Sequence, residues 1–191
     1  MKALEEKIRK EGKLMPGDVL KVDNFLNHQI DVRFLDEMGL EFKRLFGDVK
    51  VTKILTIEAS GISIGVVTSK YFDYCPVVFA KKTAAKNMSA DIYSAGLHSY
   101  TRGIDHVASV SKNYISSDDK VLIVDDFLAN GEALKALISI CEQAGAEVVG
   151  CGIIVEKAYQ PGGKMIRERG ITVHSLAKVS YLDDTRIEFE D

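Results

Sequence analysis

Two adjacent carboxylates that follow an apolar run are the residues of this sequence best suited to carry chemistry. Asp125 and Asp126 come directly after VLIV at residues 121–124, and a turn with Asn130 and Gly131 then leads into a helical pattern. The free amides and positive dipole end of a helix N-terminus bind anions, and a glycine lets the backbone approach a phosphate closely. Adjacent carboxylates on a turn can accept hydrogen bonds from neighbouring sugar hydroxyls. The segment therefore predicts a site for a phosphate beside a vicinal diol, as in a ribose 5-phosphate.

Two other interpretations of this segment stay open at the level of its residues. The carboxylates could help to hold a divalent cation, or they could cap the helix with no ligand. The segment lacks both the GxxxxGKS/T pattern of a P-loop and the GxGxxG turn of a dinucleotide-binding fold. A phosphate bound here would therefore be held in a different way from either of these.

Length and composition place this segment in a single globular domain. The chain has 191 residues with 46% hydrophobic and 28% charged residues, and its formal charge is 25 − 28 = −3. At about 100–200 residues per domain, one domain with a sizeable core is expected, and disordered, collagen-like and coiled-coil classes are excluded. A nucleic-acid-binding domain is typically basic. The mild acidity therefore argues against a nucleic-acid partner.

The cysteines and the N-terminal residues indicate the cellular compartment of the protein. Cys75, Cys141 and Cys151 are an odd number without CxxC spacing, and each lies in an apolar run, which favours buried free thiols over disulfides or zinc. No apolar stretch reaches the about 18 residues of a membrane span. The charged N-terminus lacks the apolar region of a signal peptide. These features predict a cytoplasmic protein without a membrane partner.

The elements that must position the carboxylates alternate between strand and helix. Apolar runs bounded by turn or charged residues predict strands, and a period near 3.6 predicts helices. Helices are predicted over residues 1–10, 30–46, 61–73 and 132–143. Strands are predicted over residues 51–59, 76–82, 120–126, 148–157 and 171–179, and a short strand or extended loop over 19–22. Such alternation is typical of an α/β fold with a parallel sheet covered on both faces, in which ligands bind beyond the carboxyl ends of the strands.

Residues 82–120 interrupt this alternation. The segment has few large apolar residues at first, and it could form a β-hairpin with arms at 89–95 and 98–103 around Gly96. An excursion this long in a domain is typical of a lid or binding loop. An ordinary exposed insertion is the alternative. The basic residues Lys81, Lys82 and Lys86 near its start would serve either an anionic ligand or solubility.

A family resemblance sharpens these expectations. Residues 121–133 resemble the 5-phosphoribosyl 1-pyrophosphate (PRPP) signature of type I phosphoribosyltransferases. VLKVDNFLNHQID at 19–31 and IVEKAYQPG at 154–162 resemble the xanthine-specific bacterial members, and the resemblance covers almost the whole chain. It implies transfer of the 5-phosphoribosyl group of PRPP to xanthine, giving xanthosine 5′-monophosphate and pyrophosphate in purine salvage. It also implies Mg²⁺ bound mainly through PRPP or pyrophosphate, and a homodimer.

The resemblance implies a particular organisation of the chain. The type I phosphoribosyltransferase fold has a mostly parallel sheet flanked by helices, with a small hood and a mobile lid loop. Here residues 1–191 would form one such domain. The hood would comprise about 1–47 and the C-terminal segment, and the lid about 82–106.

The resemblance also assigns the phosphate and ribose contacts. The catalytic carboxylates Asp125 and Asp126 would bind the ribose 2′- and 3′-hydroxyls, and the short pyrophosphate loop would contain Ala59, Ser60 and Gly61. The loop around the 5-phosphate would consist of Ala129, Asn130, Gly131, Glu132 and Ala133. Many relatives have Thr or Ser hydroxyls there, so backbone amides must do most of the binding in this chain. A carboxylate at Glu132 would repel a phosphate, and we expect it to point away or to reach a metal-bound water.

Three residues would recognise the base: Leu20, Asn27 and Lys157. Without the resemblance, they would be a core residue, a helix-capping residue and a solvated surface charge. The Lys157 ammonium only donates, so it suits the O6 carbonyl of an oxopurine and mismatches the amino group of adenine. Asn27 offers two donor hydrogens and an acceptor, which suits the second carbonyl that distinguishes xanthine from hypoxanthine.

Two alternatives to a xanthine enzyme remain. The base could be guanine, hypoxanthine or adenine. The chain could also be a PRPP-sensing transcriptional regulator, although such proteins place a helix-turn-helix domain before the core. Only about 50 residues precede the first core strand here, which disfavours a regulator.

Overall fold

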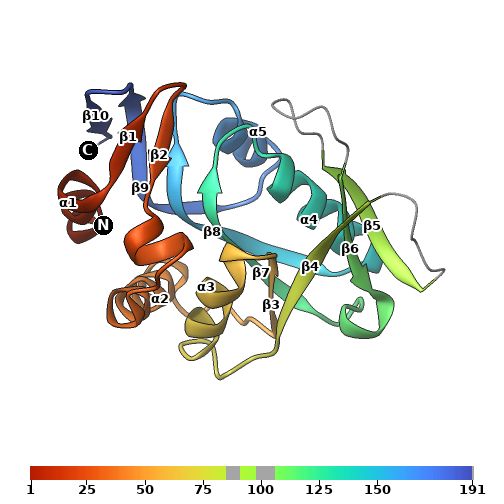
Figure 1. The fold of residues 1–191 in the computed structure, drawn as a ribbon. Helices are drawn as coiled ribbons and strands as arrows, with labels where there is room; N and C mark the ends of the chain where they lie inside the picture. The colour runs from red at the N-terminus through yellow and green to blue at the C-terminus, as the bar shows by residue number, and fades with distance from the viewer. Residues whose placement is uncertain (85–90, 98–105, 191) are drawn as a thin grey trace.

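The computed structural model describes residues 1–84, 91–97 and 106–190, and it arranges them as a central sheet flanked by helices (Figure 1). The helices are α1 (Lys2–Glu11), α2 (Val32–Phe46), α3 (Ser60–Ser69), α4 (Glu132–Ala144) and α5 (Gly162–Glu168), with a π-helical turn at Asp23–Asn27 and a 3₁₀ turn at Lys112–Tyr114. The strands are β1 (Lys13–Met15), β2 (Val19–Lys21), β3 (Lys53–Ile57), β4 (Val77–Ala84), β5 (Ile92–Leu97), β6 (His106–Ser111), β7 (Lys120–Leu128), β8 (Glu147–Lys157), β9 (Val173–Leu182) and β10 (Ile187–Phe189).

The main sheet is mostly parallel, as predicted. Its strand order is β10-β9-β8-β7-β3-β4-β6-β5, while β1 and β2 form a separate two-stranded sheet. The five central strands from β9 to β4 are parallel. Strands β10, β6 and β5 pair antiparallel at the edges. The carboxyl ends of the parallel strands therefore meet at one edge, which is where the predicted ligand residues must lie.

Alternate residues of β7 supply two hydrophobic cores, one on each face of the sheet. Leu122 and Val124 pack with residues of α1, α2 and α3. Val121 and Ile123 pack with residues of α4 and α5. Both faces of the strand are thus buried, which explains why its sequence is a continuous apolar run rather than an alternating one.

Capping residues set the two ends of α2 and the C-terminal end of α4. The Asp31 side chain caps α2 by accepting a hydrogen bond from the Phe34 amide at 3.1 Å. Gly47 ends α2 with a φ of 63°, and Gly145 ends α4 with a φ of 71°. Only glycine adopts such angles without steric cost. The predicted C-terminal ends of these two helices agree with the structure to within one residue, whereas α3 ends at Ser69 and not at the predicted residue 73. Helix α5 and strands β1 and β10 were not predicted.

The predicted hairpin is confirmed in part: β5 and β6 pair antiparallel, but Gly96 does not lie at the turn between them. Gly96 lies within β5, opposite Val107 of β6, and β6 also pairs with β4. The glycine is therefore part of an edge strand, where its effect on strand stability is tolerated, and is not a turn residue. The predicted arm at 98–103 and Lys86 lie outside the described residues, as does much of the predicted lid.

The cysteine prediction is confirmed. Cys75, Cys141 and Cys151 are all buried and free. Burial raises the pKa of the Cys141 and Cys151 thiols to about 12, so both stay protonated at neutral pH. Within the described residues, no helix has the length and apolar character needed to cross a membrane.

Candidate active site

The two carboxylates lie at the carboxyl end of β7, and their oxygens are oriented by backbone amides. Asp125 is only 4% exposed, whereas Asp126 is half-buried. The Asp126 amide donates to Asp125 Oδ1 at 3.0 Å, and the Phe127 amide donates to Asp126 Oδ1 at 2.8 Å. The strand therefore presents two preoriented carboxyl groups side by side.

Among the described residues, Asp125 forms no ion pair with a cationic side chain. Burial is the main cause that raises its pKa well above the ordinary aspartate value, and the neighbouring charge of Asp126 raises it further. The hydrogen bond from the Asp126 amide and the positive charge of Lys82 oppose this shift without reversing it. Such a displaced carboxyl pKa is typical of a functional site rather than of a structural ion pair.

The predicted 5-phosphate loop joins β7 to α4. Gly131 caps α4 with a φ of 83°, in the left-handed region that favours glycine. Asn130 is exposed, while Ala129 and Ala133 are half-buried. The first amides of α4 are therefore available to an anion. Glu132 forms an ion pair with Lys135 at 2.8 Å; that its carboxylate points away from a bound phosphate stays a prediction.

The predicted pyrophosphate loop lies beside Asp125. A β-carbon added to Gly61 would lie 1.9 Å from the Thr56 hydroxyl oxygen and 3.5 Å from Asp125 Oδ1. Ala59 and Ser60 precede this glycine at the start of α3, after a cis peptide bond between Glu58 and Ala59. Only a residue without a side chain can bring the α3 N-terminus this close to β3 and β7, so the candidate pyrophosphate loop lies beside Asp125.

The structure brings Asn27 to the carboxylate pair. The Asn27 side-chain nitrogen donates to Asp126 Oδ2 at 2.8 Å. Its side-chain oxygen is buried and has no hydrogen-bond partner among the described residues. A buried acceptor without a partner is costly, so a ligand that donates to it would relieve that cost. The N-terminal hood thus contacts the candidate ribose site directly.

The structure places Lys157 and Leu20 in different surroundings. The Lys157 ammonium donates to the Asp18 carbonyl oxygen at 2.6 Å, and burial lowers its pKa. Leu20, two residues after Asp18, is 7% exposed and belongs to the larger hydrophobic core. The hairpin of β1 and β2 therefore connects both residues. The position of Leu20 fits its interpretation as a core residue; its contact with the base stays a prediction.

Two residues near the site were misjudged or missed. Glu156, next to Lys157, would be an exposed neighbour by its sequence context, but it is 3% exposed and accepts two hydrogen bonds from Arg167, at 2.6 and 2.7 Å. Gly162, in the first turn of α5, donates its amide hydrogen to the Ala129 carbonyl oxygen of the phosphate loop at 3.0 Å. The signal for it was the Pro-Gly-Gly run at 161–163, which marks a close approach of two backbone segments.

The residues present suit a metal ion that arrives with its substrate. Within the described part of the chain, no group of three His, Cys, Asp or Glu side chains is arranged to hold a metal. Backbone amides already occupy one oxygen each of Asp125 and Asp126, and Glu132 of the phosphate loop is paired with Lys135. Mg²⁺ is commonly bound by one or two carboxylates together with substrate phosphates. The site fits that mode and not an all-protein cage.

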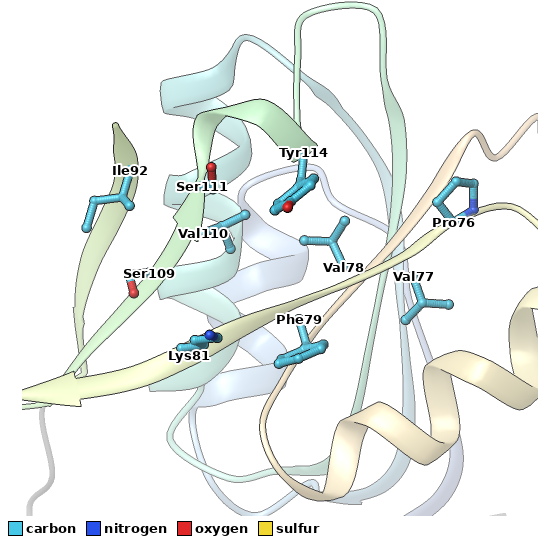
Figure 2. Close-up of a pocket in the computed structure, with 10 residues that line it drawn as sticks. All are labelled: Pro76, Val77, Val78, Phe79, Lys81, Ile92, Ser109, Val110, Ser111 and Tyr114. Carbon is cyan, nitrogen blue, oxygen red and sulfur yellow. The ribbon is translucent and has the colours of Figure 1, made fainter. Parts of the chain in front are cut away.

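A second hollow lies away from these residues. It has a volume of about 570 Å³ and is lined by residues of β4, β5 and β6 and the turn after β6 (Figure 2). Phe79 and Tyr114 border it, and Lys81 is the charged residue among the ten that line it. None of the residues predicted for the active site lines this hollow.

The sequence matches one protein family over most of its length. Residues 23–168 match the phosphoribosyl transferase domain. The chain belongs to the phosphoribosyl transferase family. It is 52% identical over 190 residues to Xanthine phosphoribosyltransferase 1 of Clostridium perfringens, with 100% of both chains covered. It is 48% identical to the Xanthine phosphoribosyltransferase of Ligilactobacillus salivarius, covering 100% of this chain and 98% of the relative.

Solved structures support the fold independently. An adenine phosphoribosyltransferase from Thermoanaerobacter pseudethanolicus matches with a TM-score of 0.72 at 20% identity, covering 92% of this chain and 99% of the other. An adenine phosphoribosyl transferase from Trypanosoma brucei, in complex with AMP, pyrophosphate and ribose-5-phosphate, matches with a TM-score of 0.76 at 16% identity, covering 92% and 79%. These likenesses confirm the predicted type I phosphoribosyltransferase fold.

Proposed function

We propose that this protein transfers the 5-phosphoribosyl group of PRPP to xanthine, releasing pyrophosphate and forming xanthosine 5′-monophosphate. The observation that carries the proposal is the hydrogen bond between Asn27 and Asp126, which joins a candidate base-binding residue to a candidate ribose-binding residue. This contact supports a single site for the base and the ribose at the carboxyl edge of the sheet. The xanthine phosphoribosyltransferases that match over the full length support the choice of base.

Each candidate group has a separate task in this reaction. Asp125 and Asp126 accept hydrogen bonds from the two ribose hydroxyls, and the amides after Gly131 bind the 5-phosphate. The amides at Ser60 and Gly61 face the pyrophosphate. Because these groups fix PRPP at three points, the C1′ atom is held where a purine nitrogen can attack it.

The reaction is a displacement at C1′. The bond from C1′ to the pyrophosphate oxygen breaks, and its electron pair leaves with pyrophosphate while the ring nitrogen forms the new bond. The purine gives up its imidazole proton, which passes to solvent or to the released pyrophosphate. Positive charge develops on the ribose as the leaving group gains negative charge. Preoriented amides near the leaving group stabilise that negative charge without reorganising, and Mg²⁺ bound through substrate oxygens would add charge neutralisation there.

Base recognition rests on donors and acceptors that face the ribose site. Lys157 donates to the O6 carbonyl, which favours oxopurines over adenine. Asn27 contacts the part of the ring that distinguishes xanthine, and Leu20 supports the ring from the hood. A site built on such polar contacts rejects a mismatched analogue by a factor on the order of 10⁴, because a buried polar group is left unpaired.

The test is pyrophosphate release from PRPP and Mg²⁺ with each purine base in turn. We expect turnover with xanthine and a much lower kcat/KM with adenine. No turnover with any purine would contradict the enzyme assignment, and a preference for adenine would contradict the role of Lys157. The variant Lys157→Met should reduce the preference for oxopurines while retaining the fold.

Assembly and location remain predictions of the same proposal. We expect a homodimer, as the family resemblance implies, in the cytoplasm. Sedimentation velocity over a range of protein concentrations measures the first, and fractionation of cells that express the tagged protein measures the second. A monomer at all concentrations would contradict the dimer without affecting the proposed reaction.

A further inference from the structure

The first turn of α5 packs against the back of the candidate 5-phosphate loop. A β-carbon added to Gly162 would lie 2.3 Å from the Ala129 carbonyl oxygen and 2.6 Å from the Gly131 amide nitrogen. Both distances are far below van der Waals contact. In the other direction, a β-carbon on Gly131 would lie 3.0 Å from the Gly162 Cα atom. Two backbone segments therefore touch here with no side chain between them.

The two glycines are required for different reasons. Gly131 has a φ of 83°, which favours glycine whatever surrounds it. Gly162 begins a helix, where any L-residue could adopt the backbone angles, so only the available space requires glycine there. Its amide also donates to the Ala129 carbonyl oxygen at 3.0 Å. Gly162 thus fixes both the distance and the orientation of the loop.

The helix that carries Gly162 is itself anchored to the sheet. Arg167 of α5 donates to both carboxylate oxygens of Glu156 on β8, at 2.6 and 2.7 Å, and to the Val173 carbonyl oxygen at 3.3 Å. A β-carbon on Gly163 would meet the Glu156 carboxylate at 1.9 Å. The ion pair therefore holds α5 tightly onto β8, so that α5 cannot yield if a side chain is added at Gly162.

We propose that Gly162 is a positioning residue for PRPP: it holds the loop at residues 129–131 in the geometry that binds the 5-phosphate. This inference rests on the proposed function, which identifies the 5-phosphate of PRPP as the ligand of the loop. Gly162 would act through the Ala129 carbonyl and the Gly131 amide rather than by touching substrate. A methyl group at this position must push the loop away from α5, which displaces the amides that face the phosphate.

The test compares Gly162→Ala with two matched variants of the same helix. Displacing a binding loop by a fraction of an ångström to 1 Å costs about tenfold to 100-fold in function. We expect Gly162→Ala to raise the KM for PRPP at least about tenfold, with the KM for xanthine and kcat at saturating PRPP within about threefold of wild type. Lys164→Ala, with an 80% exposed side chain on the same helix, should leave all three constants unchanged.

Gly163→Ala separates positioning from general damage to the helix. Its β-carbon would meet the ion pair and not the loop, so it should lower the unfolding midpoint in urea while raising the KM for PRPP less than Gly162→Ala does. If Gly162→Ala leaves the KM for PRPP unchanged, or raises both KM values and lowers kcat alike, the proposed role is wrong. Absence of turnover in the wild type would instead overturn the proposed function. If Gly162→Ala does not fold, Gly162→Ser and isothermal titration of inorganic pyrophosphate and ribose 5-phosphate on the folded variants decide the matter: only ribose 5-phosphate should bind more weakly.

Discussion

Neighbouring strands β7 and β8 each carry a buried carboxyl group towards the same edge of the sheet, yet the two groups behave in opposite ways. Asp125 on β7 is 4% exposed and Glu156 on β8 is 3% exposed. Burial and the charge of Asp126 raise the pKa of Asp125. Burial would also raise the pKa of Glu156, but hydrogen bonds from Arg167 and Ser175 outweigh it and the pKa is lowered.

The difference is one of partners, and it separates a structural group from a functional one. Glu156 has both oxygens engaged by a guanidinium and a hydroxyl, so its charge is compensated within the protein. Asp125 has an amide and another carboxylate as neighbours. A buried carboxyl group without a cation lowers the stability of the folded state at neutral pH. Such a group is typical of a functional site, which is consistent with the proposed binding of the ribose hydroxyls.

The largest expected effect on stability comes from removing the cation that compensates Glu156. Arg167→Met retains the aliphatic packing but leaves Glu156 buried without its cation, which should cost about 3–5 kcal/mol of unfolding free energy. Urea denaturation at neutral pH measures the loss. The loss should shrink as the pH falls, because the unpaired Glu156 can then take up a proton.

The matched control is the double variant Glu156→Gln with Arg167→Met. It removes the buried charge together with its partner, so the desolvation penalty disappears and most of the lost stability should return. If the double variant is as unstable as Arg167→Met alone, the loss comes from packing or from the contact of Arg167 with Val173, and the ion pair is not its cause.

Substitutions of the uncompensated carboxylates on β7 should affect activity more than folding stability. Asp126→Ala removes an acceptor for the ribose hydroxyls and the partner of Asn27, and we expect kcat/KM for PRPP to fall roughly 100-fold. Because Asp126 is half-buried, its unfolding free energy should change by less than about 1 kcal/mol. Lys164→Ala is the control that should have no effect. If Asp126→Ala changes kcat/KM for PRPP no more than this control does, the carboxylate does not contact the substrate.

Asp125→Asn should give the opposite sign of stability change from Arg167→Met. An amide has nearly the shape of the carboxyl group but no charge to desolvate, so the variant should be about 1 kcal/mol more stable than wild type at neutral pH. The folded pKa of Asp125 lies above its unfolded value, so wild-type stability falls as the pH rises from the unfolded pKa through the folded one. The advantage of the variant should therefore be small near pH about 4 and grow towards neutrality. An advantage that stays constant over this range would show that Asp125 is not the titrating group.

The sequence predicted the carboxylates of β7 but not the buried ion pair of β8. The position of Asp125 and Asp126 followed from the apolar run before them, and the ends of α2 and α4 followed from Gly47 and Gly145. These signals are local, since they depend on residues within one strand or one helical turn. The parallel direction of the central strands likewise follows from the alternation of strands and helices, whereas their order in the sheet was not predicted.

The missed features depend on contacts between distant residues. Glu156 is compensated by Arg167, 11 residues away, and by Ser175, 19 residues away, so nothing in its own neighbourhood revealed its burial. Asn27 reaches Asp126 across 99 residues, and only the family resemblance suggested that they share a site. Helix α5 has seven residues and begins with two glycines, which makes its helical pattern too short to detect.

The smallest expected effect isolates burial as the cause of the contrast. Glu142 and Arg169 form the same kind of ion pair between α4 and the end of α5, but their side chains are 59% and 42% exposed. Water screens this pair and each partner remains solvated when the other is removed. Glu142→Ala should therefore cost less than about 1 kcal/mol, and about 0.5 M NaCl should remove the difference from wild type. The same salt should leave most of the loss in Arg167→Met, because the Glu156 carboxylate that loses its partner is buried, with a 3% exposed side chain, even though Arg167 is 35% exposed. Equal salt sensitivity of the two losses would mean that burial does not set their magnitudes.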